Sequence, residues 1–260
     1  MLDLFPRNQI GLCLIRQKRL PITALLVIAV LPFCCSAQDQ TGTSAPEVLQ
    51  NYVEALGGEM VLRSLEAIKY EGTINPAGTH PSSFSCLYAP GRGALRVVEL
   101  APGHVNRVGF DGEHIWRQRG HYAIRHRAEG FEIRELELPG MPTTALEWLE
   151  RKDKAILLDT KRIDGRVIDV IRIGRVEGQL VTGFFDRESG LLVQSVYGDG
   201  SRASEYRFEY AEEPIDGVRF VNKTTRSMSK TTSHLIVDRF VVNPELDGNE
   251  FRIPDGVEIR

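Results

Sequence analysis

Cysteine is scarce in this 260-residue chain, and three of its four cysteines lie within the first 35 residues. Only Cys86 lies beyond them, so the rest of the chain has no second cysteine for an internal disulfide bond. Domains that depend on a disulfide framework are therefore excluded. Cys86 alternates with Phe84 and Tyr88, which predicts a small core residue on one side of a strand rather than a reactive thiol.

Long hydrophobic runs are also missing. The apolar run at residues 20–33 has fourteen residues, short of the roughly 20 needed to span a bilayer. Arg16, Lys18 and Arg19 precede it, and the small residues Ser36 and Ala37 follow it, as in a cleaved Sec signal peptide at 1–37. An uncleaved anchor and a lipid on Cys34 or Cys35 stay open as alternatives. This pattern predicts a periplasmic or secreted protein, with a disordered polar segment at 38–43 and one domain at 44–260.

An excess of positive charge is absent. Residues 38–260 contain 28 Lys and Arg against 34 Asp and Glu, a net charge of −6. This balance argues against nucleic acid as a partner, because such binders need a basic surface.

Motifs for catalysis or metal binding are lacking as well. The chain has no Gly-x-Ser-x-Gly, His-Glu-x-x-His or Cys-x-x-Cys pattern. His121 and His126 are five residues apart, which places them on opposite faces of a strand. Asp186 and Glu188 lie close together, as in a glycosidase pair, but a hairpin turn is the favoured interpretation. We therefore expect no enzyme activity, no cofactor and no metal, although an enzyme whose polar groups come from distant strands stays possible.

Asp-Gly pairs, by contrast, are abundant. This pair suits tight turns that need positive φ. Short runs rich in Val, Ile, Phe, Tyr and Thr surround most of them, which is typical of antiparallel hairpins. The six pairs are at 111–112, 164–165, 199–200, 216–217, 247–248 and 255–256.

Thirteen candidate strands lie between these and other turns. Residues 205–210 alternate charged and aromatic side chains, so that strand has one solvated and one buried face. The candidates are 67–74, 83–89, 94–100, 104–110, 113–119, 121–127, 155–163, 167–175, 179–186, 191–198, 202–211, 218–227 and 231–242.

Helices are expected at two places. Ser44 and Glu47 form a capping box before a helix at 45–56, and a short second helix follows at 59–65. A second capping box at Thr144 opens a helix at 145–152. The predicted fold is mainly β: one large curved antiparallel sheet, an incomplete β-barrel, whose concave face the N-terminal and mid-chain helices cover.

Aromatic side chains are the best lead to function. They predict an apolar cavity that binds an acyl chain, and an ordinary filled core is the alternative. The expected lining residues are Trp116, Phe184, Tyr206, Phe208, Tyr210 and Phe220. The expected lid residues are Leu146, Trp148 and Leu149.

Turn and helix motifs along the whole exported part resemble those of the outer-membrane lipoprotein-sorting superfamily, the LolA/LolB-like family. The motifs are Glu-Ala-Leu-Gly-Gly at 54–58, the approach from Leu65 to Gly72, and the segments at 109–116, 185–192, 215–220 and 251–254. The resemblance implies an incomplete antiparallel barrel with a helical lid over a hydrophobic cavity. It implies a non-catalytic carrier of a lipid or lipoprotein acyl chain, with peripheral or transient membrane contact. The alternative is an envelope sensor that binds a partner protein.

Overall fold

The computed structural model describes residues 43–76, 79–128, 136, 140–176, 179–200 and 203–259. The expected signal peptide and the expected polar segment, apart from Thr43, lie outside these residues. The helices are α1 (Ala45–Ala55), α2 (Glu59–Arg63), α4 (Pro142–Glu150) and the short 3-10 helix η1 (Lys152–Lys154). Among the described residues, no helix combines the length and the apolar character that crossing a membrane requires.

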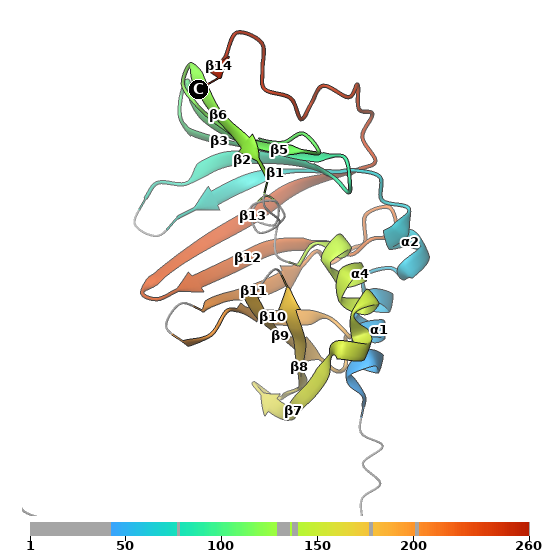
Figure 1. The fold of residues 1–260 in the computed structure, drawn as a ribbon. Coiled ribbons are helices and arrows are strands. Elements are labelled where there is room, and N and C mark those ends of the chain that lie inside the picture. Colours follow the sequence, from blue (N-terminus) through green and yellow to red (C-terminus); the bar gives the residue numbers. More distant parts are fainter. Residues whose placement is uncertain are drawn as a thin grey trace, which may run out of the picture. The chain divides into compact units, whose positions relative to one another are not determined.

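Fourteen strands form one open sheet (Figure 1). In chain order they are β1 (Ile68–Asn75), β2 (Ser82–Ala89), β3 (Gly93–Ala101), β4 (His104–Phe110), β5 (His114–Arg119), β6 (Tyr122–Arg127), β7 (Ile156–Ile163), β8 (Arg166–Val176), β9 (Gln179–Asp186), β10 (Leu192–Tyr197), β11 (Ser204–Tyr210), β12 (Val221–Met228), β13 (Thr231–Val242) and β14 (Glu258–Ile259). Their order across the sheet is β14-β6-β5-β4-β3-β2-β1-β13-β12-β11-β10-β9-β8-β7. Neighbours are antiparallel except β14, which runs parallel to β6. The predicted fold class is confirmed.

Four of the six Asp-Gly pairs connect antiparallel segments, as predicted, whereas those at 247–248 and 255–256 lie in the segment after β13. Asp164 and Gly165 have φ values of 49° and 82°, and Asp216 and Gly217 have 50° and 80°. Two consecutive positive φ angles are the signature of a type I′ hairpin turn, whose twist matches that of the flanking strands. The glycine has positive φ in the other four pairs as well.

Helix α4 begins three residues earlier than predicted. Pro142 occupies its first turn and Met141 is the N-cap, without a side-chain capping bond. Proline is preorganised for the first turn of a helix and lacks an N–H that would need a partner there. Thr144 is therefore not a cap but a buried residue inside the helix.

The helices α1, α2 and α4 cover one face of the sheet, here called the helical face (Figure 1). The main core lies between them and strands β1, β2, β8 to β11 and β13. Residues paired across antiparallel strands share a face. The register therefore places Tyr70, Cys86 and Phe240 together on the helical face, and their sequence neighbours on the opposite, outer face.

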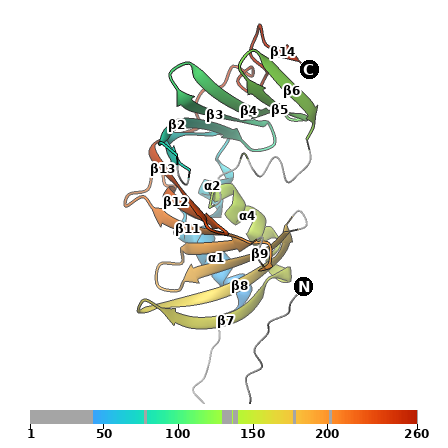
Figure 2. The same ribbon diagram turned by 90° about the vertical axis from the view of Figure 1, so that its left-hand side faces the viewer.

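The C-terminal segment after β13 covers part of the outer face of β2 to β5. Phe251 packs against Gly93, where a Cβ atom would meet its ring at 2.5 Å. The backbone carbonyl of Phe251 accepts a 2.8 Å hydrogen bond from the indole Nε1 of Trp116. Figure 2 shows β14 joining the edge of the sheet beside β6. Part of the outer face of β2 to β5 is thus covered by a part of the chain that is distant in sequence.

Candidate functional site

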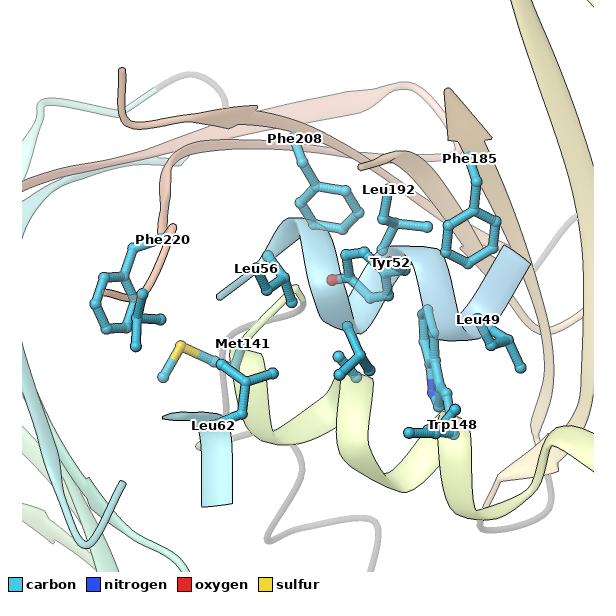
Figure 3. Close-up of a cluster of buried hydrophobic side chains, with 14 of the residues drawn as sticks. Leu49, Tyr52, Leu56, Leu62, Met141, Trp148, Phe185, Leu192, Phe208 and Phe220 are labelled. Atoms are coloured by element: carbon cyan, nitrogen blue, oxygen red, sulfur yellow. The ribbon is translucent and has the colours of Figure 1, made fainter. Parts of the chain in front are cut away.

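Aromatic rings from both layers meet in the main core (Figure 3). The ring of Tyr52 on α1 lies 5.4 Å from that of Phe185 on β9 and 6.3 Å from that of Trp148 on α4, measured between centroids. Trp148 and Phe185 are 6.4 Å apart, edge to face. All three side chains are almost completely buried. The interface between helices and sheet is therefore aromatic and apolar at its centre.

Helical spacing of apolar residues creates this interface. In α1, Leu49, Tyr52 and Val53 recur at intervals that place them on one face, and all are buried. In α4, Ala145, Trp148 and Leu149 do the same. The two faces turn toward each other and toward the sheet, because neither helix can bury its apolar side alone.

Four of the six predicted lining residues lie on the helical face. Phe208 and Phe220 are buried in the main core, and Phe220 stacks on Phe240 with ring centroids 4.6 Å apart. Tyr206 and Tyr210 are half-buried and pack against the same core. The three predicted lid residues also contact this core: Trp148 and Leu149 are buried and Leu146 is partly buried. The structure thus brings these seven residues to one interface.

The other two predicted lining residues lie on the outer face. The register pairs Phe184 with Val170, and the Lys161 amine lies 5.1 Å from the centre of its ring. Trp116 is fully buried, but under Phe251 rather than under the helices. Trp116 and Phe184 are therefore separated from the helical layer by the sheet itself.

Phe185 and Tyr52 lie at the centre of the interface, although neither was among the predicted lining residues. Phe185 directly follows the chosen Phe184, and successive strand residues face opposite sides. The ring of Phe185 packs over Gly183, where a Cβ atom would lie only 2.6 Å from the ring. The absence of a side chain at Gly183 therefore leaves the space that the ring occupies. Tyr52 was recognisable only as one of several apolar residues on the first helix.

Hydroxyl groups are buried within the apolar core. Tyr210 donates a 3.0 Å hydrogen bond to the carbonyl of Leu192. Burial raises the pKa of Tyr52 above its usual range, and the neighbouring Tyr210 hydroxyl acts weakly in the opposite direction. Ser195 Oγ is fully buried and has no hydrogen-bond partner in the described part of the chain. These groups are uncharged at neutral pH, so they provide polarity without charge.

Cys86 lies on the helical face beside Tyr70. Burial raises the pKa of its thiol to about 11, an effect that the Tyr70 hydroxyl offsets only in part. We expect Cys86 to react with a thiol reagent at pH 8 at least about 100-fold more slowly than an exposed cysteine, because little thiolate forms. The measurement is the labelling rate of a chain with Cys13, Cys34 and Cys35 replaced by serine, with the urea-unfolded chain as control. Equally fast labelling in the folded and unfolded chains would contradict the buried placement.

The acidic pair Asp186 and Glu188 lies where β9 leads into β10. Asp186 is the last residue of β9, and its carboxylate accepts hydrogen bonds from two groups of the following turn, Ser189 Oγ at 3.0 Å and the Glu188 amide at 3.3 Å. It thus acts as a turn residue, as the sequence favoured. No group of three or more His, Cys, Asp or Glu side chains suited to a metal occurs within the described ranges.

A hollow of about 420 Å³ lies outside the main core. Strands β1 to β3 and the C-terminal segment line it, with Leu87, Leu95 and Leu246 as apolar walls and Lys69 and Glu250 as charged groups. Its walls belong largely to the outer face, so it is distinct from the helix–sheet interface.

Comparison with known proteins identifies the fold. No family model and no curated protein matches the chain. Among solved structures, the LolA superfamily protein NE2245 from Nitrosomonas europaea has a TM-score of 0.56 at 14% identity, over 81% of this chain and 98% of that one. A candidate outer-membrane lipoprotein-sorting domain from Vibrio parahaemolyticus has a TM-score of 0.54 at 11% identity, over 79% and 95%. A DUF1329 family protein from Desulfovibrio piger has a TM-score of 0.54 at 14% identity, over 80% and 95%.

Each of these chains is covered almost completely, and the likeness extends over about four fifths of this chain. The identities are low, so the likeness concerns the fold. The chain has a LolA-like fold.

Proposed function

We propose that this protein is a non-catalytic carrier that holds a lipid or lipoprotein acyl chain between the helical face of its sheet and the helices α1 and α4, in the periplasm. The observation that carries the proposal is the aromatic, apolar interface formed by Tyr52, Trp148 and Phe185 in a LolA-like fold. In this arrangement Tyr52, Trp148 and Phe185 are almost completely buried. A ligand would enter by displacing α4 from the sheet.

The free energy gained by burying an acyl chain is large enough to offset the cost of displacing α4. A 16-carbon chain gains roughly 10 kcal/mol on burial, at about 0.8 kcal/mol per methylene, before entropy and strain are counted. Uncovering Met141, Trp148 and Leu149 costs about 1.5–3 kcal/mol for each side chain. The ligand takes over part of these contacts, so the cost falls further.

The two tryptophans of the chain provide the test. Trp148 lies at the helix–sheet interface and Trp116 under Phe251 on the outer face. We expect a brominated fatty acid to quench the fluorescence of the Trp116→Phe variant, in which Trp148 is the reporter, because bromine quenches only at short range. The Trp148→Phe variant, which reports from Trp116, is the matched control and should lose little intensity.

Three possible results of this experiment distinguish the proposed site from an acyl-chain site elsewhere and from the absence of lipid carriage. Saturable quenching of Trp148 alone supports the proposal. Quenching of Trp116 alone would place the acyl chain on the outer face and contradict the site. Absence of binding to either variant, together with no lipid in an extract of the protein purified from its own envelope, would contradict carriage and favour a protein partner.

A further inference from the structure

Strand β7 is the free edge of the sheet opposite β14. No strand of the described residues pairs with its outer edge. Seven of its eight residues are exposed, and only Leu157 is half-buried against the core. Three large apolar side chains are among the exposed ones: Ile156 at 54%, Leu158 at 42% and Ile163 at 38%. An exposed edge of this length and composition is a template for pairing with another strand.

Charges along β7 restrict what can pair with it. The register with β8 places Asp159 and Lys161 on the outer face and Thr160 between them on the helical face. Thr160 is fixed there by a 2.7 Å hydrogen bond from its hydroxyl to Asp169. Lys161 is held on the outer face over the ring of Phe184. The two opposite charges thus stand side by side on one face.

A two-fold axis perpendicular to the sheet would pair β7 with β7 of a second copy. Such an axis keeps each face on its own side. From Asp159 to Ile163, the stretch of β7 that follows the shift in register after Leu157, only registers centred on a residue are therefore allowed. Centring on Asp159 or on Lys161 places that charge opposite itself, which is unfavourable. Centring on Thr160 places Asp159 opposite Lys161 of the second copy, twice over, and Thr160 opposite Thr160. Centring on Arg162 would also place a charge opposite itself, so among the registers centred on residues 159–162 only the one centred on Thr160 opposes unlike charges.

We infer that the protein forms a homodimer through antiparallel pairing of β7 with β7 of a second copy, centred on Thr160. The pairing joins the two sheets into one and provides partners for the edge backbone groups of both copies. It leaves the helix–sheet interface of each copy unchanged, so it does not depend on the proposed function.

Charge reversal tests the register directly. Asp159→Lys and Lys161→Asp each place like charges opposite one another in a homodimer. We expect each to raise the dimer dissociation constant by about tenfold or more, measured by analytical ultracentrifugation. Mixing the two variants restores unlike charges at both positions, so the heterodimer should form with nearly the original affinity. The double variant Asp159→Lys with Lys161→Asp should also dimerise.

Glu205 and Arg207 provide a matched control. They have the same spacing and charges on β11, a strand paired on both sides, and they form an ion pair of 2.8 Å. Glu205→Lys should leave dimerisation unchanged. A protein that stays monomeric at millimolar concentration would overturn the inference. So would a dimer that neither single reversal weakens, or single variants whose mixture fails to associate, provided that circular dichroism shows each variant folded.

Discussion

Replacement of Gly72 by alanine is expected to destabilise the protein by about 3 kcal/mol or more, because the new methyl group has no space. A Cβ atom at Gly72 would overlap the backbone carbonyl of Ile236 on the neighbouring strand β13. A backbone atom cannot rotate away as the end of a side chain can. Relief therefore requires β1 and β13 to separate at the centre of the sheet.

Register explains why the two strands approach so closely here. The pairing of β1 with β13 shifts between Glu71 and Gly72, which marks a β-bulge. A bulge bends the strand and increases its twist. Glycine at this position thus allows the local bend while β1 stays paired with β2 on its other side.

The measurement for Gly72→Ala is the free energy of unfolding from urea denaturation, with Thr73→Ala as the control. Thr73 is the next residue of the same strand and faces the other side, so its truncation should cost less than about 1 kcal/mol. Similar losses in the two variants would show that the bulge accommodates a side chain, and would contradict the close approach.

Most strand positions could be predicted because turn chemistry is local. Asp-Gly and other glycine-bearing turns determine where one strand ends and the next begins. All thirteen predicted strands are present, with ends that differ by up to three residues. The strand that was missed, β14, has two residues and pairs with β6, which is 136 positions earlier between Tyr122 and Glu258. No local sequence pattern predicts a pairing between segments so far apart in the chain.

Strand facing was harder to predict, and β9 shows why. Its adjacent residues Phe184 and Phe185 are both aromatic, so alternation cannot tell which one faces the helices. Contacts with the helices determine the facing of this strand, because Tyr52 and Trp148 pack against Phe185 and not against Phe184. This information comes from residues more than 35 positions away.

Trp116 illustrates a different limit. It and its neighbour Ile115 are both fully buried, although they face opposite sides of β5. Ile115 packs with Ala94 and Leu136, while Phe251 covers Trp116. A large aromatic residue in a strand predicts burial, but not which layer buries it.

Removal of the Arg187 side chain is the second change with a large expected effect. Arg187 donates hydrogen bonds to both carboxylate oxygens of Asp169, and Thr160 donates to one of them. The Asp169 side chain is only 2% exposed, whereas that of Arg187 is 43% exposed. Arg187→Ala therefore leaves a buried carboxylate without its counter-charge, which costs about 2–3 kcal/mol when water reaches part of the gap.

The control for Arg187→Ala is Arg207→Ala, which removes an ion pair with Glu205 whose arginine is 69% exposed. Its cost should stay below about 1 kcal/mol. Asp169→Ala combined with Arg187→Ala should be less destabilising than the sum of the two single changes, since the double variant buries no unpaired charge. Equal losses for Arg187→Ala and Arg207→Ala would show that water replaces the guanidinium completely.

The effect should extend to helix α1, because the turn that carries Arg187 supports that helix. Gly190 in the same turn approaches the backbone of Asn51, where a Cβ atom would lie 2.9 Å from the carbonyl oxygen. Glu47 in the first turn of α1 interacts electrostatically with Arg187. Loss of the arginine should therefore raise amide hydrogen exchange in α1 more than in β1, which lies beyond the core. Since α1 holds Tyr52 against Phe185, a looser α1 should also admit the brominated fatty acid faster. Uniform acceleration of exchange across the chain would instead indicate global destabilisation without a specific role for this turn.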